Sequence, residues 1–392
     1  MRGKTAKGDA HGRRPASYLR RGGVCLILGA IPAAYAQQAA SDAPADPAAG
    51  SAKPAAPKIT NLADVHVQGH TGGYVATHAS TGSKTDAPII DNPQSISIVT
   101  RQQIEDQGAQ TIDQALRYTT GVYSQDGTDL RFDQLNARGF AMDSYLDGLH
   151  LYPSPRFAVP RVDPYLLEQI DVLRGPSSVL YGQGNPGGLV NFVSKLPTDT
   201  PHNEVTLQIG NRAYHQLGFD LGGAANQDGS VLYRVVGLGR VANTQAGAIE
   251  DHRFAIAPSV SFRPDADTSF TLLGGFQRDP EGGLFNPAPS SGTVFRNPNG
   301  KLGPNRYFGD PDTDRMNRTQ YWIGDEFEHR FNDVWSVSQS LRYLHMDQHY
   351  YQTSVTSNYL TGPAYPPAST VMMWANLDNE RYGQLAGDVH AQ

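Results

Sequence analysis

The stretch RFAIAPSVSFR at residues 253–263 decides the fold class, because apolar and polar side chains alternate along it. Phe254, Ile256, Val260 and Phe262 share one side of an extended chain, and arginine, alanine and serine share the other. This two-residue period is typical of a β-strand with one apolar face and one polar face. The sequence therefore predicts a sheet that meets an apolar medium on one side and a polar one on the other.

Seven more segments have the same period. The eight segments lie near residues 204–210, 215–222, 231–241, 253–263, 269–277, 320–329, 335–345 and 380–390. Their connections alternate in length, with short turns at 226–229, 264–268 and 332–333 and long loops at 278–319 and 346–379. Short turns at one end and long loops at the other are typical of an outer-membrane β-barrel, although a soluble β-sandwich also alternates. The export signal described next favours the barrel.

The N-terminus has the three parts of a secretory signal peptide. Several arginines precede an apolar run from Val24 to Ile31, and Ala34-Tyr35-Ala36 supplies the small residues of a cleavage site. The run is too short to span a bilayer. We therefore predict a signal peptide at residues 1–36 and export of the remaining chain.

The composition excludes several classes of protein. Of 392 residues, 39% are hydrophobic and 18% charged, and the formal net charge is -6. This balance is too apolar for a disordered chain and too acidic for a nucleic-acid binder, which needs a basic face. The low hydropathy argues against a helical membrane protein. A single cysteine excludes a disulfide framework.

Three short segments follow the signal peptide. Residues 37–61 are rich in Ala, Pro and Ser, and residues 69–84 are rich in Gly, Thr and Ser, so we predict two linkers. Between them, residues 62–68 alternate like a short strand. Such a strand is either an edge of the next domain or a peptide that a partner binds by strand addition.

Residues 85–200 predict a compact α+β module, which precedes the alternating part at 201–392. Two capping boxes, which begin at Thr100 and Thr111, indicate helix starts. The dipeptide Asp147-Gly148 fits the tight turn of a hairpin. Strands are predicted at 95–99, 170–173 and 189–194.

The module contains a series of motifs in a recognisable order. They are PQSIS (93–97), QALRY (114–118) followed by GV (121–122), RGF (138–140), YLDG (145–148), IDVLRGP (170–176), SVLYG (178–182), PGG (186–188) and Asn191. This order resembles the plug domain of TonB-dependent siderophore receptors, most closely the ferrichrome and hydroxamate type. The resemblance runs without large gaps from about residue 88 to 200.

The resemblance implies an α+β plug domain inside an antiparallel transmembrane β-barrel of about 22 strands. Because this chain holds only about eight, we expect either a fragment of a longer receptor, with plug and first part of the barrel, or an inert truncated product. The implied function is import of ferric siderophore across the outer membrane of a Gram-negative bacterium, with energy from an inner-membrane TonB-type protein. An importer of haem or cobalamin is the alternative, and no enzymatic activity is expected.

The resemblance also suggests ligand-binding residues. Arg138 matches a position at the plug apex, and Tyr152 and Tyr165 correspond to two further apex loops. Each of the three has a structural alternative, such as packing against the barrel wall. Phe285 lies in a long loop where the ferrichrome type usually carries exposed aromatics, although the expected Tyr and Trp are absent here. No resident cofactor or metal site is expected, because the chelate already saturates the iron with oxygen ligands.

Partner contacts complete the expectations. Asp64, Val65, His66 and Val67 match the segment that binds the TonB-type protein, which favours strand addition for residues 62–68. Outer-membrane lipid would cover the apolar side of the strands, and no nucleic acid is expected. Structural contacts between plug and barrel are predicted for one arginine of the plug and two wall glutamates, which are Arg174, Glu326 and Glu328.

Overall fold

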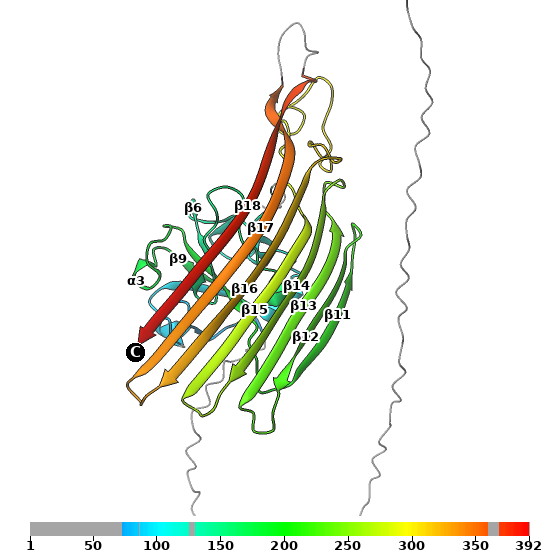
Figure 1. Ribbon diagram of the computed structural model, residues 1–392. Helices are drawn as coiled ribbons and strands as arrows, with labels where there is room; N and C mark the ends of the chain where they lie inside the picture. The colour runs from blue at the N-terminus through cyan, green and yellow to red at the C-terminus, as the bar shows by residue number, and fades with distance from the viewer. Residues whose placement is uncertain (1–72, 86, 125–128, 130, 360–367, 392) are drawn as a thin grey trace, which may run out of the picture. The chain divides into compact units, whose positions relative to one another are not determined.

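The computed structural model describes residues 73–85, 87–124, 129, 131–359 and 368–391 (Figure 1). All of them belong to one compact unit. The predicted signal peptide, the first linker and the coupling residues Asp64 to Val67 lie outside the described residues.

Eight antiparallel strands after residue 201 form a single sheet, which we call the wall. Its order follows the chain, so that the first and last strands are its edges (Figure 1). The strands are β11 (His202–Ile209), β12 (His215–Ala224), β13 (Val231–Asn243), β14 (Glu250–Phe262), β15 (Thr268–Gly282), β16 (Arg315–Arg330), β17 (Ser336–Tyr359) and β18 (Val371–Ala391). Each predicted alternating segment overlaps one of these strands, which confirms the prediction of about eight.

The connections of the wall confirm the predicted asymmetry in one respect and correct it in another. Short turns follow β12, β14 and β16, and this side is called the turn end. The opposite side, called the loop end, carries the segment 283–314. The loop predicted at 346–379 is much shorter, because β17 and β18 continue far into it. Long loops are extracellular in outer-membrane barrels, so the loop end corresponds to the outside.

The outer face of the wall is apolar, as alternation requires for a lipid-facing surface. On β11, the side chains of Val205, Leu207 and Ile209 are 70%, 74% and 76% exposed. Exposed aromatic pairs stand across neighbouring strands: Phe262 faces Phe270 near the turn end, and Phe276 faces Tyr321 nearer the loop end. Two aromatic levels flanking an apolar band are typical of a membrane-spanning sheet.

The plug module is built on a five-stranded sheet with the order β3-β9-β10-β7-β8. These strands are β3 (Ser95–Thr100), β9 (Leu167–Arg174), β10 (Gly188–Ser194), β7 (Asp143–Leu146) and β8 (Leu149–His150). Two smaller sheets contain β1 (His78–Ala79) with β2 (Ala87–Pro88), and β4 (Val122–Ser124) with β5 (Leu135–Ala137) and β6 (Phe140–Ala141). The helices are α1 (Arg101–Asp106), α2 (Ile112–Ala115), α3 (Ser178–Tyr181), η1 (Ile89–Asp91) and η2 (Pro164–Leu166).

Local sequence signals explain most of the plug. The Thr100 hydroxyl accepts from the Gln103 N–H at 3.4 Å, and the Thr111 hydroxyl accepts from the Gln114 N–H at 3.2 Å, as capping boxes predict. In the hairpin turn, Asp147 and Gly148 adopt φ values of 50° and 74°, which Asp-Gly accommodates. Strand β1 lies in the stretch that was expected to be a linker.

Plug and wall share one hydrophobic core. Its buried residues include Val172 and Phe192 of the plug sheet together with Val236, Trp322 and Leu344 of the wall. The plug therefore packs on the inner face of the wall, opposite the apolar outer face. The same inner face carries the charged residues described next.

Candidate functional site

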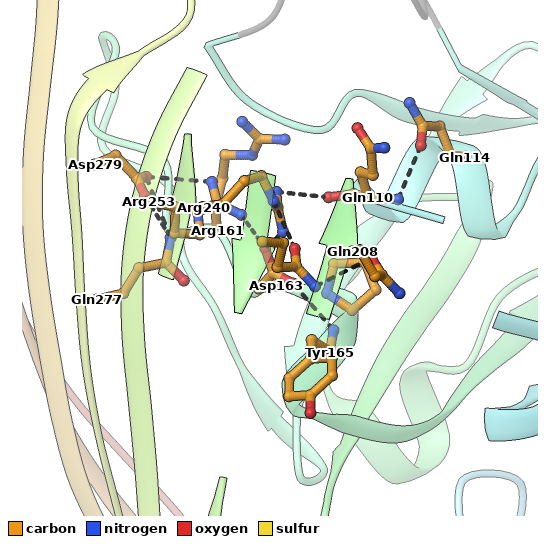
Figure 2. Close-up of polar contacts among 12 residues, drawn as sticks. Gln110, Gln114, Arg161, Asp163, Tyr165, Gln208, Arg240, Arg253, Gln277 and Asp279 are labelled. Atoms are coloured by element: carbon orange, nitrogen blue, oxygen red, sulfur yellow. Dashed lines mark hydrogen bonds and ion pairs between the residues drawn. The ribbon is translucent and has the colours of Figure 1, made fainter. Parts of the chain in front are cut away.

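The buried carboxylate of Asp163 lies where the plug meets the wall. It caps η2 by accepting from the backbone N–H of Tyr165 at 3.0 Å. From the wall, the Arg253 guanidinium donates to it through Nη1 at 2.8 Å, and the Arg240 guanidinium donates through Nη2 (Figure 2). The three charged side chains are each 1% exposed. Burial raises the pKa of Asp163, but the guanidiniums of Arg240 and Arg253 outweigh burial and hold the pKa below its usual range.

The network continues along the wall through Asp279 of β15. Its carboxylate accepts from Nε of Arg253 at 2.7 Å and from Nη2 of Arg318 at 2.6 Å. Arg318 also reaches the plug, where its Nη1 donates to the backbone carbonyls of Arg131 at 3.1 Å and Val159 at 3.2 Å. A buried guanidinium requires acceptors for its donors. Plug carbonyls supply some of them here.

Other arginines of the wall bind plug carbonyls in the same way. The pairs are Arg234 with Leu196, Arg240 with Gln110, and Arg342 with Leu146, Leu149 and His150. A guanidinium carries several N–H donors in a rigid plane. Every residue has a backbone carbonyl that can accept from them, whatever its side chain. The wall thus holds the backbone of the plug as well as its charges.

A second ion-pair cluster lies where the plug continues into β11. Asp220 of the wall accepts from the Lys195 ammonium at 2.7 Å and from Nε and Nη2 of Arg234 at 2.8 and 2.9 Å. The Lys195 ammonium also stands 4.8 Å from the ring centre of Tyr165. Burial, followed by the charge of Arg101, lowers the pKa of Lys195 to about 8 despite Asp220. This junction cluster therefore pairs a plug cation with a wall anion.

Glutamines of the wall add neutral contacts to the charged ones. Gln320 pairs with both backbone groups of Arg161: its Oε1 accepts from the N–H at 3.3 Å, and its Nε2 donates to the carbonyl at 2.5 Å. Gln384 does the same with two residues, accepting from the Tyr152 N–H at 3.2 Å and donating to the His150 carbonyl at 2.5 Å. These amides bind the plug backbone as a neighbouring strand would.

Toward the loop end, the buried Arg131 guanidinium lies among four aromatic rings. Asp129 accepts from its Nε at 2.8 Å and its Nη2 at 2.7 Å, and the Tyr350 hydroxyl accepts from its Nη1 at 2.9 Å. Four ring centres lie 5.0 to 5.3 Å from the guanidinium carbon, those of Phe132, Phe157, Phe285 and Tyr350. Cation–π contacts of this kind order aromatic side chains. This loop-end cluster joins Phe132 and Phe157 of the plug to Phe285 and Tyr350 of the wall side.

Two of the predicted ligand residues, Phe285 and Tyr152, lie at different distances from the loop end of the wall. Phe285 belongs to the loop-end cluster, where its backbone pairs with the Gln352 amide of β17. Tyr152 is 52% exposed and stands beside His150, with ring centres 3.7 Å apart. Its backbone partner Gln384 lies four positions closer to the turn end of β18 than Glu380, which binds the Phe157 N–H. Tyr152 therefore lies closer to the turn end than the loop-end cluster does.

The other two predicted ligand residues occupy contrasting sites. Tyr165 is 7% exposed and packs against β12, where Gly218 leaves space for its ring. This place matches the structural alternative stated for it. Arg138 is exposed in the turn between β5 and β6, with a φ of 52°. Burial lowers the pKa of Arg174, and the charge of Arg138 lowers it further.

The contacts of Arg174 differ from those expected. Its guanidinium donates to the hydroxyls of Ser95 at 3.3 Å and Ser97 at 2.8 Å, both on the adjacent strand β3. Glu326 instead lines a pocket with Asp147 and Arg342. The reason is topological, because Arg174 ends the β9 strand inside the plug sheet and its neighbours there are serines. Glu328, on the same strand as Glu326, is exposed.

Sequence reasoning missed the residues that join plug and wall. Asp163, Arg240 and Arg253 were not singled out as partners, although Arg253 opens the polar side of the alternating stretch. Arginines on the polar face of strands whose other face is apolar were the available signal, because such charges need buried partners. Among the described residues, no group of three or more His, Cys, Asp or Glu side chains is placed to hold a metal ion. No helix in the described part of the chain is long and apolar enough to cross a membrane.

An α+β module held by inward arginines against a sheet with an apolar outer face is the arrangement of a plug domain on the wall of an outer-membrane barrel. Residues 88–189 match the family model described as TonB-dependent Receptor Plug Domain. Residues 88–189 therefore form a plug domain of the kind found in TonB-dependent receptors, which are proteins of the Gram-negative outer membrane. The match lies within the predicted module at 85–200.

Two characterised relatives are similar over most of this chain. The ferrichrome outer membrane transporter/phage receptor of Escherichia coli strain K12 is 39% identical over 307 residues, which are 77% of this chain and 40% of that protein. The ferrioxamine B receptor of Salmonella typhimurium strain SL1344 is 40% identical over 272 residues, or 68% and 39% of the two chains. The chain thus spans about two fifths of the relatives it matches. The predicted resemblance to siderophore receptors of this type is confirmed.

Solved structures share the fold. The ferripyoverdine receptor of the outer membrane of Pseudomonas aeruginosa, bound to ferripyoverdine, superposes with a TM-score of 0.72 at 20% identity, over 82% of this chain and 42% of that one. The ferric-catecholate import receptor Fiu from Escherichia coli K12, in its closed form, gives 0.67 at 23% identity, over 81% and 46%. These likenesses confirm a plug with the strands of a receptor barrel.

Proposed function

We propose that this chain belongs to an importer that binds ferric siderophore at the loop end and carries it inward with energy from a TonB-type protein. The observation that carries the proposal is the occupied inner face of the wall. Asp163 of the plug is held by Arg240 and Arg253 of the wall, and Lys195 of the plug is held by Asp220 of the wall, so a ligand passes only if the plug moves. Breaking buried ion pairs takes several kcal/mol, and the work must be supplied from outside the protein.

The ligand class follows from the relatives and from the chemistry of the loop end. The two relatives are named for ferrichrome and ferrioxamine B. Such chelates bring iron already coordinated by oxygen, so the receptor supplies apolar contact and hydrogen bonds instead of metal ligands. Phe285 and the rings around Arg131 support apolar contact of this kind. Arg138 and Tyr152 are further candidates for ligand contact because both are exposed.

The haem alternative gains no support from His150. Its ring lies 4.6 Å from that of Tyr145 and 3.7 Å from that of Tyr152, and its side chain is 13% exposed. Burial lowers its pKa, with Asp143 opposing and Arg342 adding to the effect. We therefore retain ferric siderophore as the proposed ligand.

Energy coupling is proposed at Asp64 to Val67, through strand addition to the TonB-type protein. Proline at position 65 removes a backbone donor from such a strand. In the complete receptor, Val65→Pro is expected to abolish energised uptake of iron from ferric ferrichrome and ferric ferrioxamine B and to leave binding unchanged.

Phe285→Ala is expected to weaken binding of the same chelates about tenfold.

Radiolabelled iron uptake and equilibrium binding on whole cells separate these effects, and Val65→Ala, which keeps the donor, is the control. Uptake by Val65→Pro at the wild-type rate would remove the coupling assignment. A wild-type receptor that binds neither chelate would overturn the ligand class.

A further inference from the structure

The segment from Ala79 to Lys84, which we call the strap, is fastened to the plug although a linker was expected there. Ala79 and Thr81 are 5% and 1% exposed. Strand β1 at its start pairs with β2, and the Lys84 N–H donates to the Ser80 carbonyl at 2.6 Å. A flexible tether would bury none of these groups.

Thr81 is the centre of the attachment. Its hydroxyl donates to Oδ2 of Asp171 at 2.5 Å and accepts from Nδ2 of Asn191 at 3.0 Å. Its carbonyl accepts from the Tyr181 hydroxyl at 2.8 Å. Asp171 and Asn191 are direct cross-strand partners on β9 and β10, in the middle of the plug sheet. One threonine thus contacts two adjacent central strands and α3.

Asp171 makes this contact energetically significant. Its carboxyl is 0% exposed, and burial raises its pKa to about 6. The remaining oxygen accepts from Nε2 of Gln169 at 2.8 Å. In its ionised form the carboxylate is a buried charge that the Thr81 hydroxyl stabilises. Hydrogen bonds to charged groups are stronger than those between neutral ones.

The rest of the strap fits closely and reaches the wall. A Cβ on Gly82 would lie 1.9 Å from Nδ2 of Asn92 and 2.4 Å from Cδ1 of Ile96, so the backbone there is in close contact with the plug. The Lys84 ammonium lies 2.7 Å from Oδ1 of Asp388 on β18 and 4.8 Å from the ring centre of Tyr181. Asp388 is near the turn end of the wall, the end whose short turns are periplasmic in outer-membrane barrels.

We propose that the strap is the mechanical link through which a pull on the N-terminal segment reaches β9 and β10, with Thr81 as its positioning residue. The inference rests on the proposed energy coupling. Because Thr81 holds two central strands by buried hydrogen bonds, tension on the strap acts directly on the plug sheet. Without this contact, the same pull extends the strap and leaves the sheet in place.

The test compares three variants of the complete receptor. Thr81→Val keeps the shape and removes the hydroxyl, whereas Thr81→Ser keeps the hydroxyl. Thr85→Val, one residue beyond the strap, removes a hydroxyl that bonds to that of Ser83 at 2.8 Å. The Thr81→Val receptor is expected to take up iron from ferric ferrichrome about tenfold more slowly, with unchanged binding and faster amide exchange at Thr81 to Lys84. The two controls are expected to behave as wild type.

Each outcome decides the matter. Wild-type uptake by Thr81→Val would overturn the link while leaving the proposed function intact. Loss of chelate binding together with uptake would also overturn it, because Thr81 would then be a folding contact. If the unmodified receptor takes up the chelate without the TonB-type protein, the proposed function fails first, and the link fails with it.

Discussion

The Asp163 and Asp220 clusters bind plug to wall with opposite polarity. At Asp163 the plug supplies the anion and the wall supplies two arginines, whereas at Asp220 the wall supplies the anion and the plug supplies Lys195. Each carboxylate joins two cations and is at most 1% exposed. The clusters differ in one chemical respect, because lysine can release its proton when it is buried and arginine cannot.

This difference assigns separate tasks to the clusters. The junction cluster lies beside the covalent passage from plug to β11, so it orders a connection that exists anyway. The Asp163 cluster joins segments 77 and 90 residues apart, and its guanidiniums stay charged whatever the plug does. Moving the plug away from the wall therefore requires that the Asp163 contacts break.

The largest effect is expected for Asp163→Asn, which leaves two buried guanidiniums without their shared anion. Loss of one partner from a buried ion pair costs about 3–5 kcal/mol. The plug of the complete receptor should unfold at a clearly lower temperature in calorimetry. Adding Arg240→Gln should recover part of the loss, because Arg253 retains Asp279. A loss below about 1 kcal/mol would show that this cluster does not hold the plug.

A pH-dependent effect is expected at the junction. Since the pKa of Lys195 is about 8 in the folded protein and 10.5 in the unfolded chain, the unfolded state binds more protons between these values. The free energy of unfolding therefore rises with pH across this window, by roughly 3 kcal/mol at most. Thermal unfolding of wild type and Lys195→Met between pH 7 and 10 measures the difference. Parallel pH profiles would contradict the assignment.

A packing change near the junction is expected to have an intermediate effect. A Cβ on Gly218 would lie 2.6 Å from Cζ of Tyr165, whereas Gly239, on the neighbouring strand, has no atom within 4 Å of such a Cβ. Gly218→Ala should destabilise the plug by about 2 kcal/mol through overpacking, and Gly239→Ala should not. Tyr165→Leu in the Gly218→Ala background should relieve the clash. Equal stability of the two alanine variants would rule out the close contact.

The sequence predicted the wall well where the two faces of a strand meet different media. Alternation at 253–263 located β14, because lipid and plug impose opposite polarities on its two sides. It failed for the outer part of β17, a strand of 24 residues, of which about 10 suffice to cross a membrane. Beyond the bilayer both faces of a strand meet polar surroundings, so no alternation marks its end.

The candidate site was predictable only in part, because it depends on contacts between residues far apart in the chain. The residues taken from the resemblance include Phe285, which lies in the loop-end cluster, and Tyr165, which is buried against Gly218. The pairing of Asp163 with Arg240 and Arg253 depends on how strands far apart in the chain align. Single-residue patterns do not encode that alignment. They do show that an arginine on an inward position needs a partner.

The smallest effect is expected where an arginine–aspartate pair is exposed to solvent. Arg330, the last residue of β16, and Asp267, in the turn between β14 and β15, form an ion pair of 2.7 Å with side chains 39% and 50% exposed. Solvent screens this attraction, so Asp267→Asn should change the stability by about 0.3 kcal/mol. Calorimetry beside Asp163→Asn makes the comparison direct, since both substitutions remove one carboxylate charge from arginine. If the exposed pair proved as costly to remove as the buried one, burial would not be the reason that the Asp163 cluster holds the plug.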